Sequence, residues 1–142
     1  MPTRTASATW KGGRTQGKGS FQGESGTISG NYSFGSRFEQ AGGTNPEELL
    51  AAAEAACYSM ALSLALEAAG TPATSVETTA HCTVEKSGGG FAITTIKLDV
   101  RADVPGADRD TFKDIAESTK SGCPVSKALM GNVEIELHAV LV

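Results

Sequence analysis

The chain has 142 residues, of which 39% are hydrophobic and 20% are charged, and its formal net charge is −4. This length suits a single soluble domain, residues 1–142, whose folding buries roughly 68% of the surface of the unfolded chain. The negative charge and the lack of a basic cluster exclude a general attraction for nucleic acid or for an anionic membrane.

The N-terminal segment, MPTRTASATWKGG, lacks the apolar stretch of a secretory signal. No run of ~18 uninterrupted apolar residues is present, so we expect no membrane-spanning helix and a cytoplasmic protein. In the cytoplasm the three cysteines do not form a disulfide framework. Cys57, Cys82 and Cys123 are therefore interpreted as buried structural thiols, metal ligands or redox groups.

The first 43 residues are rich in Gly, Ser and Thr. Segments 5–11 and 26–35 alternate well enough to be strands, with glycine turns between them. A long helix is then predicted from Pro46 to about Ala69, ending at Gly70.

The start of this helix carries several favourable residues. Asn45 is a good N-cap, and Pro46 suits the first helical position. Glu47 and Glu48 lie at the positive end of the helix dipole, and Glu48 has the capping-box spacing from Asn45. From Leu49 onward polar residues are few, so the helix must be covered on most sides and is the central helix of the fold. One small domain would struggle to cover it, which indicates a partner subunit.

The remaining elements alternate between strands and helices. Residues 74–86 and 91–104 are β-rich and flank a Ser-Gly-Gly-Gly sequence, which predicts a hairpin. An amphipathic helix is predicted at about Asp108–Thr119, and a short third helix starts within 121–131. Residues 132–142 alternate as a closing strand.

Cys123 and Cys57 occupy different helical positions. Cys123 is predicted at or next to an N-cap, with Pro124 at the first helical position. Free backbone N–H groups and the helix dipole favour a thiolate there, and Lys120 and Lys127 add positive charge nearby in sequence. Cys57 lies in the middle of the long helix among small residues, which suits an inert core residue and a thiol at the base of a pocket equally well.

Cys82 is interpreted as structural. It lies in a strand next to His81, and neighbours on a strand point to opposite faces, so the two do not form a joint ligand pair. A zinc site made from the three cysteines with His81 and His138 is a weaker interpretation, because none of the close-paired spacings of zinc proteins occurs. The sequence also has no G-x-S-x-G, Walker or dinucleotide motif.

Two segments, TNPEELLAAAEAACYSMALSLALEAAG and SGCPVSKAL, resemble the signature segments of the OsmC/Ohr family of small hydroperoxide-reducing stress proteins. The sequence YSFGSRFEQAGG that precedes the first segment, and GFAIT that follows it, resemble the OsmC branch more than the Ohr branch. The resemblance covers nearly the whole chain in the family's order, including WKG near the start and VPG before the second helix.

The resemblance implies an α+β fold that is an intertwined homodimer. Strands from both chains would build each antiparallel sheet, with the long helices packed between the sheets and two active sites at the subunit interface. Cys57 corresponds to the peroxidatic thiol of the family and Cys123 to the resolving thiol. Arg37 in SRFE corresponds to the arginine that activates the thiolate, and Glu47 to its carboxylate partner.

The implied activity is the reduction of small organic or fatty-acid hydroperoxides, without metal, flavin or haem. A thiolate attacks the peroxide and becomes a sulfenic acid, which a second thiol converts to a disulfide. An external dithiol, of dihydrolipoyl type by the resemblance, then reduces the disulfide by exchange. A guanidinium stays charged and stabilises the thiolate. The candidates for an apolar wall that favours organic peroxides are Met60, Leu64, Tyr58, Phe34 and Phe38.

Three further residues bear on this interpretation. Glu47 lies ten positions before Cys57, about 15 Å along an ideal helix, so it acts only by orienting an arginine. Its alternative role is that of a first-turn acid that stabilises the helix dipole. Arg14, in GGRTQG, resembles the place of the arginine in the Ohr branch and is an alternative to Arg37. Glu54, three residues before Cys57, raises the pKa of that thiol unless it is paired or points away.

Two other functions stay open. One is a non-enzymatic protein of the same fold that binds an apolar ligand at the dimer interface, for which the charge of Glu54 is an argument. The other is a structural or redox-sensing dimer whose cysteines record oxidation without turnover. Two cysteines together with an arginine favour the peroxidase, and turnover with a dithiol separates it from both alternatives.

Overall fold

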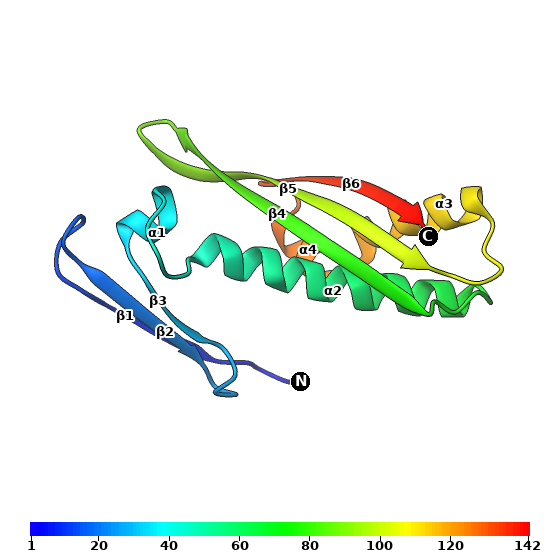
Figure 1. Ribbon diagram of the computed structural model, residues 1–142, viewed down its shortest axis with the longest axis horizontal. Helices are drawn as coiled ribbons and strands as arrows, with labels where there is room; N and C mark the ends of the chain where they lie inside the picture. The colour runs from blue at the N-terminus through cyan, green and yellow to red at the C-terminus, as the bar shows by residue number, and fades with distance from the viewer. The chain divides into compact units, whose positions relative to one another are not determined.

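The computed structural model describes all residues, Met1–Val142. The chain forms two compact units, Met1–Glu48 and Leu49–Val142. In Figure 1 the first runs from blue to the start of the long helix, and the second continues through green to red. The expectation that the two units make one domain stays a prediction.

The first unit is a three-stranded antiparallel sheet followed by a short helix. Its strands are β1 (Ala6–Lys11), β2 (Lys18–Gly23) and β3 (Ser29–Tyr32), in the order β1-β2-β3. Gly19 on β2 lies beside the rings of Trp10 and Tyr32, and a Cβ there would approach the Tyr32 ring to 2.5 Å. The sheet therefore requires glycine at this position. The two predicted strands are confirmed in β1 and β3, whereas β2 was not predicted.

The helix α1 (Phe34–Phe38) was also not predicted from the sequence. Ser33 is its N-cap and accepts from the backbone N–H of Ser36, while the Ser36 hydroxyl accepts from the backbone N–H of Ser33. The Ser36 hydroxyl also donates to the carbonyl of Thr44 at 2.8 Å. These bonds satisfy the end of a helix too short to be stable by itself.

The long helix α2 (Pro46–Ala68) begins and ends close to the predicted residues. The side chain of Asn45 accepts from the backbone N–H of Glu48 at 2.8 Å. The predicted capping box is only half formed, because the Glu48 carboxylate accepts from the Thr44 hydroxyl instead. At the C-terminus Gly70 adopts φ +86°, a conformation that favours glycine and lets the chain leave the helix.

The second unit contains the sheet β4-β5-β6, made of β4 (Ser75–Ser87), β5 (Gly90–Asp103) and β6 (Glu134–Leu141). The hairpin β4–β5 turns at Gly88 and Gly89, both with positive φ, as the glycine run predicts. β6 pairs with β5 in parallel, so this sheet is mixed, and the expectation of purely antiparallel sheets is wrong here. The connection through two helices provides the long crossover that a parallel pair needs.

Those crossover helices are α3 (Arg109–Gly122) and α4 (Pro124–Leu129). α3 continues three residues beyond the predicted Thr119, up to the residue before Cys123. Asp108 caps α3, since its carboxylate accepts from both the backbone N–H and the hydroxyl of Thr111.

The hydrophobic core of the second unit lies between the sheet and the helices α2 and α3. Its fully buried members include Leu62, Leu66, Ile96, Leu98 and Phe112. The phenol of Tyr58 is also buried and donates to the carbonyl of Ala116 at 2.8 Å. Tyr58 is thus a core residue rather than part of an apolar pocket wall, which corrects the sequence-based expectation.

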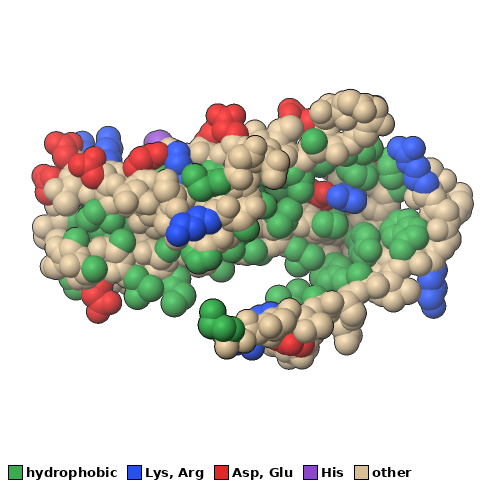
Figure 2. Space-filling view, turned by 180° about the vertical axis from the view of Figure 1, so that it is seen from behind, with side chains coloured by type: hydrophobic (Ala, Val, Ile, Leu, Met, Phe, Trp, Pro, Cys, Tyr) green, Lys and Arg blue, Asp and Glu red, His purple; other side chains and the backbone are tan.

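α2 is long and apolar enough to cross a membrane by length and composition, but it is a core helix of the second unit. Its buried side carries Leu62 and Leu66, while Met60 and Leu64 on other sides are 67% and 54% exposed. Figure 2 shows hydrophobic side chains gathered along the edge of the unit where α2 runs. The second unit alone therefore leaves part of this apolar helix uncovered.

The N-cap of α3 predicts a dependence of stability on acid. The hydrogen bonds from Thr111 hold the pKa of Asp108 below its ordinary value. A lowered pKa in the folded state contributes stability above the unfolded value of ~3.9, and this contribution is lost as the pH falls through the folded value. We expect Asp108→Asn, which keeps a capping acceptor, to lose less thermal stability than the wild type from about pH 6 to about pH 3.

Thermal denaturation followed by circular dichroism checks this expectation. Asp110→Asn is the matched control, because Asp110 is an exposed first-turn acid of α3 that is not the cap. It should show the pH dependence of the wild type. Equal losses of Tm in the Asp108 variant and the wild type would contradict the role of the cap.

Candidate active site

The structure brings two cysteines into direct contact. The thiol of Cys123 donates to the Sγ of Cys57, with 2.8 Å between the two sulfur atoms. The residues are 66 positions apart in the chain, and the contact is made by packing α2 against the junction of α3 and α4. Cys123 is fully buried and Cys57 is half-buried. The two cysteines are not bonded to each other, and their sulfur atoms lie farther apart than the ~2.05 Å of a disulfide bond.

The backbone around Cys123 explains why its side chain is available. The N–H of Cys123 donates to the Thr119 carbonyl and ends α3, while its carbonyl accepts from the N–H of Lys127 and starts α4. Pro124 occupies the first position of α4. The side chain makes no capping hydrogen bond. The predicted N-cap position is confirmed, but the thiol points to Cys57 instead of to the end of its own helix.

The environment of Cys57 favours the neutral thiol. Burial raises its pKa most, and the shared hydrogen bond with Cys123 raises it further. The negative charge of Glu54 acts in the same direction. The backbone N–H of Val125, at the start of α4, donates to Cys57 and lowers the pKa, without reversing the overall direction. The N-terminus of α4 was expected to stabilise a thiolate on Cys123, but the hydrogen bond from its Val125 N–H goes to Cys57 instead. Of the two lysines nearby in sequence, Lys120 is paired with Glu117 at 2.7 Å.

Glu54 is a fully buried carboxylate one helical turn before Cys57. Its Oε1 accepts from the hydroxyl of Ser126 on α4, which is also fully buried. Its Oε2 has no hydrogen-bond partner. Glu54 is therefore paired, as the sequence allowed, yet its charge still acts on Cys57. Ser126 was not predicted as a site residue, although its place in the segment SGCPVSKAL, three residues after Cys123, is a signal that could have identified it.

The predicted pair of Arg37 and Glu47 is formed within the first unit. The Nε and Nη2 atoms of Arg37 both lie 2.8 Å from Oε1 of Glu47. Glu47 is buried and its Oε2 has no partner. Glu47 also lies in the first turn of α2, the position that its alternative role requires. Since the first unit holds this pair and the second holds the thiols, the geometry between the arginine and Cys57 stays a prediction.

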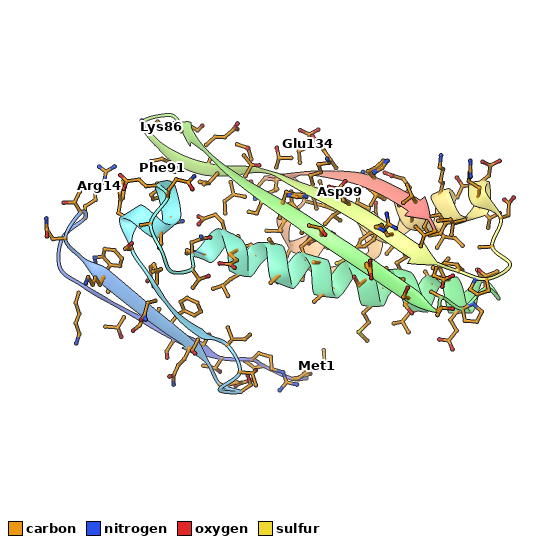
Figure 3. All side chains as sticks on the ribbon, viewed as in Figure 1. Met1, Arg14, Lys86, Phe91, Asp99 and Glu134 are labelled. Carbon is orange, nitrogen blue, oxygen red and sulfur yellow. The ribbon has the colours of Figure 1, made fainter.

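Both candidate arginines line one pocket of the first unit. The guanidinium of Arg37 lies over the ring of Phe38 at 5.0 Å, and that of Arg14, labelled in Figure 3, lies over Phe34 at 4.7 Å. The pocket has a volume of about 350 Å³, and its other lining residues are Trp10, Tyr32 and Ser33. Two cations on an aromatic surface suit an apolar molecule that carries a polar or anionic group.

The other predicted ligand candidates lie elsewhere. Cys82 is half-buried on β4 and packs against the core, in agreement with a structural role. His81 and His138 lie on the sheet beside Asp99, which Figure 3 labels, at 3.1 Å and 3.8 Å from its carboxylate oxygens. No group of three or more His, Cys, Asp or Glu side chains in residues 1–142 is placed to hold a metal ion.

Known proteins share both the sequence and the fold of this chain. The model of the family described as OsmC-like protein matches residues 39–138. Peroxiredoxin OsmC of Escherichia coli K12 is 48% identical over 130 residues, which cover 91% of each chain. The organic hydroperoxide resistance protein OhrB of Bacillus subtilis is 34% identical over 97 residues, 68% of this chain and 69% of its own.

Solved structures agree with the sequence relatives. The crystal structure of OhrB of Bacillus subtilis matches with a TM-score of 0.75 and 28% identity over 96% of this chain and 98% of its own. An OsmC-like protein from Mycoplasma pneumoniae has a TM-score of 0.76 over 99% and 98% of the two chains, at an identity of 16% that speaks for the fold alone. The chain has an α+β fold and belongs to the OsmC-like family, within its OsmC branch.

Proposed function

We propose that the protein is a thiol-dependent peroxidase that reduces organic hydroperoxides to alcohols. The observation that carries the proposal is the contact of 2.8 Å between the thiols of Cys57 and Cys123. The relatives support it, since one is named a peroxiredoxin and others are named organic hydroperoxide resistance proteins. An inert core would not need two thiols to meet at a helix junction.

The catalytic cycle has three steps. The Cys57 thiolate attacks the outer peroxide oxygen, the O–O bond breaks, and the alkoxide takes a proton and leaves as an alcohol. The sulfenic acid formed on Cys57 then reacts with the Cys123 thiol, giving a disulfide and water. An external dithiol, of dihydrolipoyl type, reduces the disulfide by exchange. The step between the two thiols needs little movement, because the sulfur atoms already touch.

Activation of Cys57 requires a cation. Burial, the hydrogen bond with Cys123 and the charge of Glu54 raise the pKa of Cys57 and outweigh the bond from Val125, so its surroundings in the second unit disfavour the thiolate. We assign the activating cation to Arg37, whose guanidinium is held by Glu47 and stays charged at all relevant pH values. Arg14 in the same pocket is the alternative.

The aromatic pocket of the first unit supports an organic substrate. Its rings, which include Phe34 and Phe38, offer apolar contact to the carbon part of a small organic or fatty-acid hydroperoxide. Hydrogen peroxide has no carbon part and would gain nothing from this surface. Met60 and Leu64, which were also predicted as wall residues, are exposed on α2. They would form part of an apolar pocket wall only if a partner subunit covered that side of the helix.

The uncovered side of α2 supports a homodimer. The helix is apolar on most sides, and a soluble protein needs a partner surface over Met60 and Leu64. We infer the intertwined homodimer of the resemblance, with strands of both chains in each sheet, α2 between the sheets and one domain made from both units. We place this protein in the cytoplasm, where its thiols stay reduced between cycles.

One observation favours the alternative of a non-enzymatic protein that binds an apolar ligand. The pKa of Cys57 is raised, which is the opposite of what a reactive thiol needs. A peroxidase would consume hydroperoxide continuously in the presence of a dithiol, whereas a ligand-binding protein would not.

Replacing Cys57 tests the function directly. We expect Cys57→Ser to abolish the consumption of cumene hydroperoxide in the presence of a dithiol, because a hydroxyl at this position cannot form the thiolate. Cys82→Ser is the matched control and should keep nearly all turnover. Wild-type turnover in the Cys57 variant would reject the assignment, and no turnover in the wild type would favour the ligand-binding alternative.

Two arginine variants decide which cation activates Cys57. We expect Arg37→Gln to slow the first oxidation of Cys57 about 100-fold, the scale for loss of one preorganised charge-stabilising donor. Arg14→Gln should slow it less than about tenfold. Rapid-mixing measurement of thiol loss gives both rate constants. A larger effect of Arg14→Gln than of Arg37→Gln would transfer the role to Arg14.

Glu54→Gln is expected to lower the pKa of Cys57. The substitution removes a negative charge that raises this pKa, while the amide oxygen can still accept from Ser126. Burial remains, so the pKa stays above its ordinary value. Titration of the thiolate by ultraviolet absorbance in the Cys82→Ser background measures the change. The control is Glu67→Gln, an exposed acid of the same helix. An unchanged or higher pKa in the Glu54 variant would contradict the electrostatic role.

Sedimentation equilibrium tests the dimer. We expect a dimer at micromolar concentration, because separation would expose the apolar side of α2 to water. A folded monomer under these conditions would reject the dimer and, with it, an active site shared between subunits.

A further inference from the structure

The pair of Glu54 and Ser126 has no role in the three catalytic steps, although it lies beside the thiols. Both side chains are fully buried, and their hydrogen bond joins α2 to α4. The second carboxylate oxygen of Glu54 has no partner. A buried carboxylate with an unsatisfied oxygen is unfavourable, and an apolar residue of similar size would pack in its place without that cost. The pair therefore calls for an explanation beyond packing.

The geometry of α4 provides one. α4 has six residues, and a helix of this length does not hold its position by itself. Its own N-cap side chain makes no capping bond, because the Cys123 thiol is turned to Cys57. Besides the bond from the Val125 N–H to Cys57, two hydrogen bonds between side chains connect this segment to α2, one through the thiols and one through Ser126. The thiol contact and the Val125 bond both use the sulfur of Cys57, whereas the bond of Ser126 does not.

We propose that Glu54 and Ser126 are positioning residues, whose hydrogen bond holds α4 so that Cys123 stays against Cys57. By holding Cys123 in place, the pair decides whether oxidised Cys57 ends as a disulfide or as a sulfinic acid. This second part rests on the proposed peroxidase function, whereas the first part concerns the thiol pair alone.

The sulfenic acid on Cys57 can become a disulfide or a sulfinic acid, and the rates of these two reactions depend on different quantities. In the first, Cys123 attacks the sulfur of Cys57, the S–S bond forms, the S–O bond breaks, and the hydroxyl leaves with the thiol proton as water. In the second, another hydroperoxide transfers an oxygen to Cys57, giving the sulfinic acid and an alcohol. The first rate is set by the position of Cys123 and the second by the concentration of peroxide. Loosening α4 therefore shifts the outcome toward sulfinic acid.

An equilibrium with oxidised and reduced glutathione tests the positioning without any peroxide. The fraction of protein with the Cys57–Cys123 disulfide, measured by mass spectrometry, gives the effective concentration of one thiol at the other. We expect Ser126→Ala to lower this value about tenfold, the scale of one lost hydrogen bond to a charged group. Glu54→Gln keeps an acceptor for Ser126 and should stay within about twofold of the wild type.

Ser59→Ala is the matched control. Ser59 lies on α2 two residues after Cys57, and its hydroxyl donates to that of Thr78 on β4 at 2.7 Å. The variant loses one hydroxyl of the same helix without touching α4, so the effective concentration should not change. If Ser126→Ala fails to fold, the double variant Glu54→Met with Ser126→Ala removes the buried charge together with its donor and should show the same tenfold loss. A folded Ser126 variant with the wild-type value, or an equal loss in Ser59→Ala, would overturn the proposal.

The second part is tested by titration with cumene hydroperoxide. In Ser126→Ala, half of Cys57 should reach the sulfinic acid at about one tenth of the peroxide concentration that the wild type needs. The rate of the first oxidation should change much less than this partition, because Cys123 forms no bond in that step and acts on it only through the pKa of Cys57. Cys123→Ser marks the limit without a resolving thiol. An unshifted titration in Ser126→Ala would overturn the role in partition. A wild type that does not react with peroxide would reject the proposed function, while the glutathione equilibrium would still decide the positioning.

Discussion

The contact between α2 and the turn at Cys123 is the interaction on which the site depends. Two thiols that are far apart in the sequence meet there, because α3 ends and α4 begins at Cys123 and this junction places the Cys123 side chain against Cys57 on α2. The core beneath this contact fixes the helices: Tyr58 donates to the carbonyl of Ala116 in the middle of α3, and Leu62 and Leu66 belong to the core cluster. Packing decides where the thiols lie, and the electrostatic surroundings decide how they react.

Each of the two units buries an acidic side chain. Glu47 and Glu54 are each buried with one carboxylate oxygen satisfied and the other without a partner. Glu47 holds a cation, whereas Glu54 is held by a neutral hydroxyl. The first arrangement presents positive charge, and the second leaves its negative charge acting on Cys57. Each acid leaves one carboxylate oxygen unsatisfied, which costs the folded protein stability, and only the charge of Glu54 acts on Cys57.

Much of the fold could be predicted from local sequence, and the misses have physical reasons. The cap and the apolar composition of α2 predict that helix, and the glycines between β4 and β5 predict the hairpin. β2 was missed because its sequence, KGSFQG, is short and contains little hydrophobic alternation. α1 was missed because five residues give no periodicity, although two serines cap it. The parallel pairing of β6 depends on the path of the crossover, which no local pattern encodes.

The site was predictable in its residue types but not in its contacts. Cysteines and an arginine in recognisable segments pointed to Cys57, Cys123 and Arg37, and the pair with Glu47 is formed as expected. The partner of Glu54 could not be inferred, because Ser126 lies 72 residues away and only the packed structure joins them. The hydrogen bond from the N–H of Val125 to Cys57 could not be predicted either. From sequence position alone, the free N–H groups at the start of α4 are expected to stabilise the thiol of its own N-cap residue, Cys123.

The backbone of Cys123 ends one helix and starts the next, and this affects how such a protein can change during evolution. The junction of α3 and α4 is built from the N–H and carbonyl of residue 123 and the ring of Pro124, and it makes no demand on the side chain. The architecture therefore tolerates other small residues at this position. A descendant of this chain that replaces residue 123 would lose the second thiol of the pair and still inherit the scaffold, so that retention of the shape says little about retention of the thiol pair.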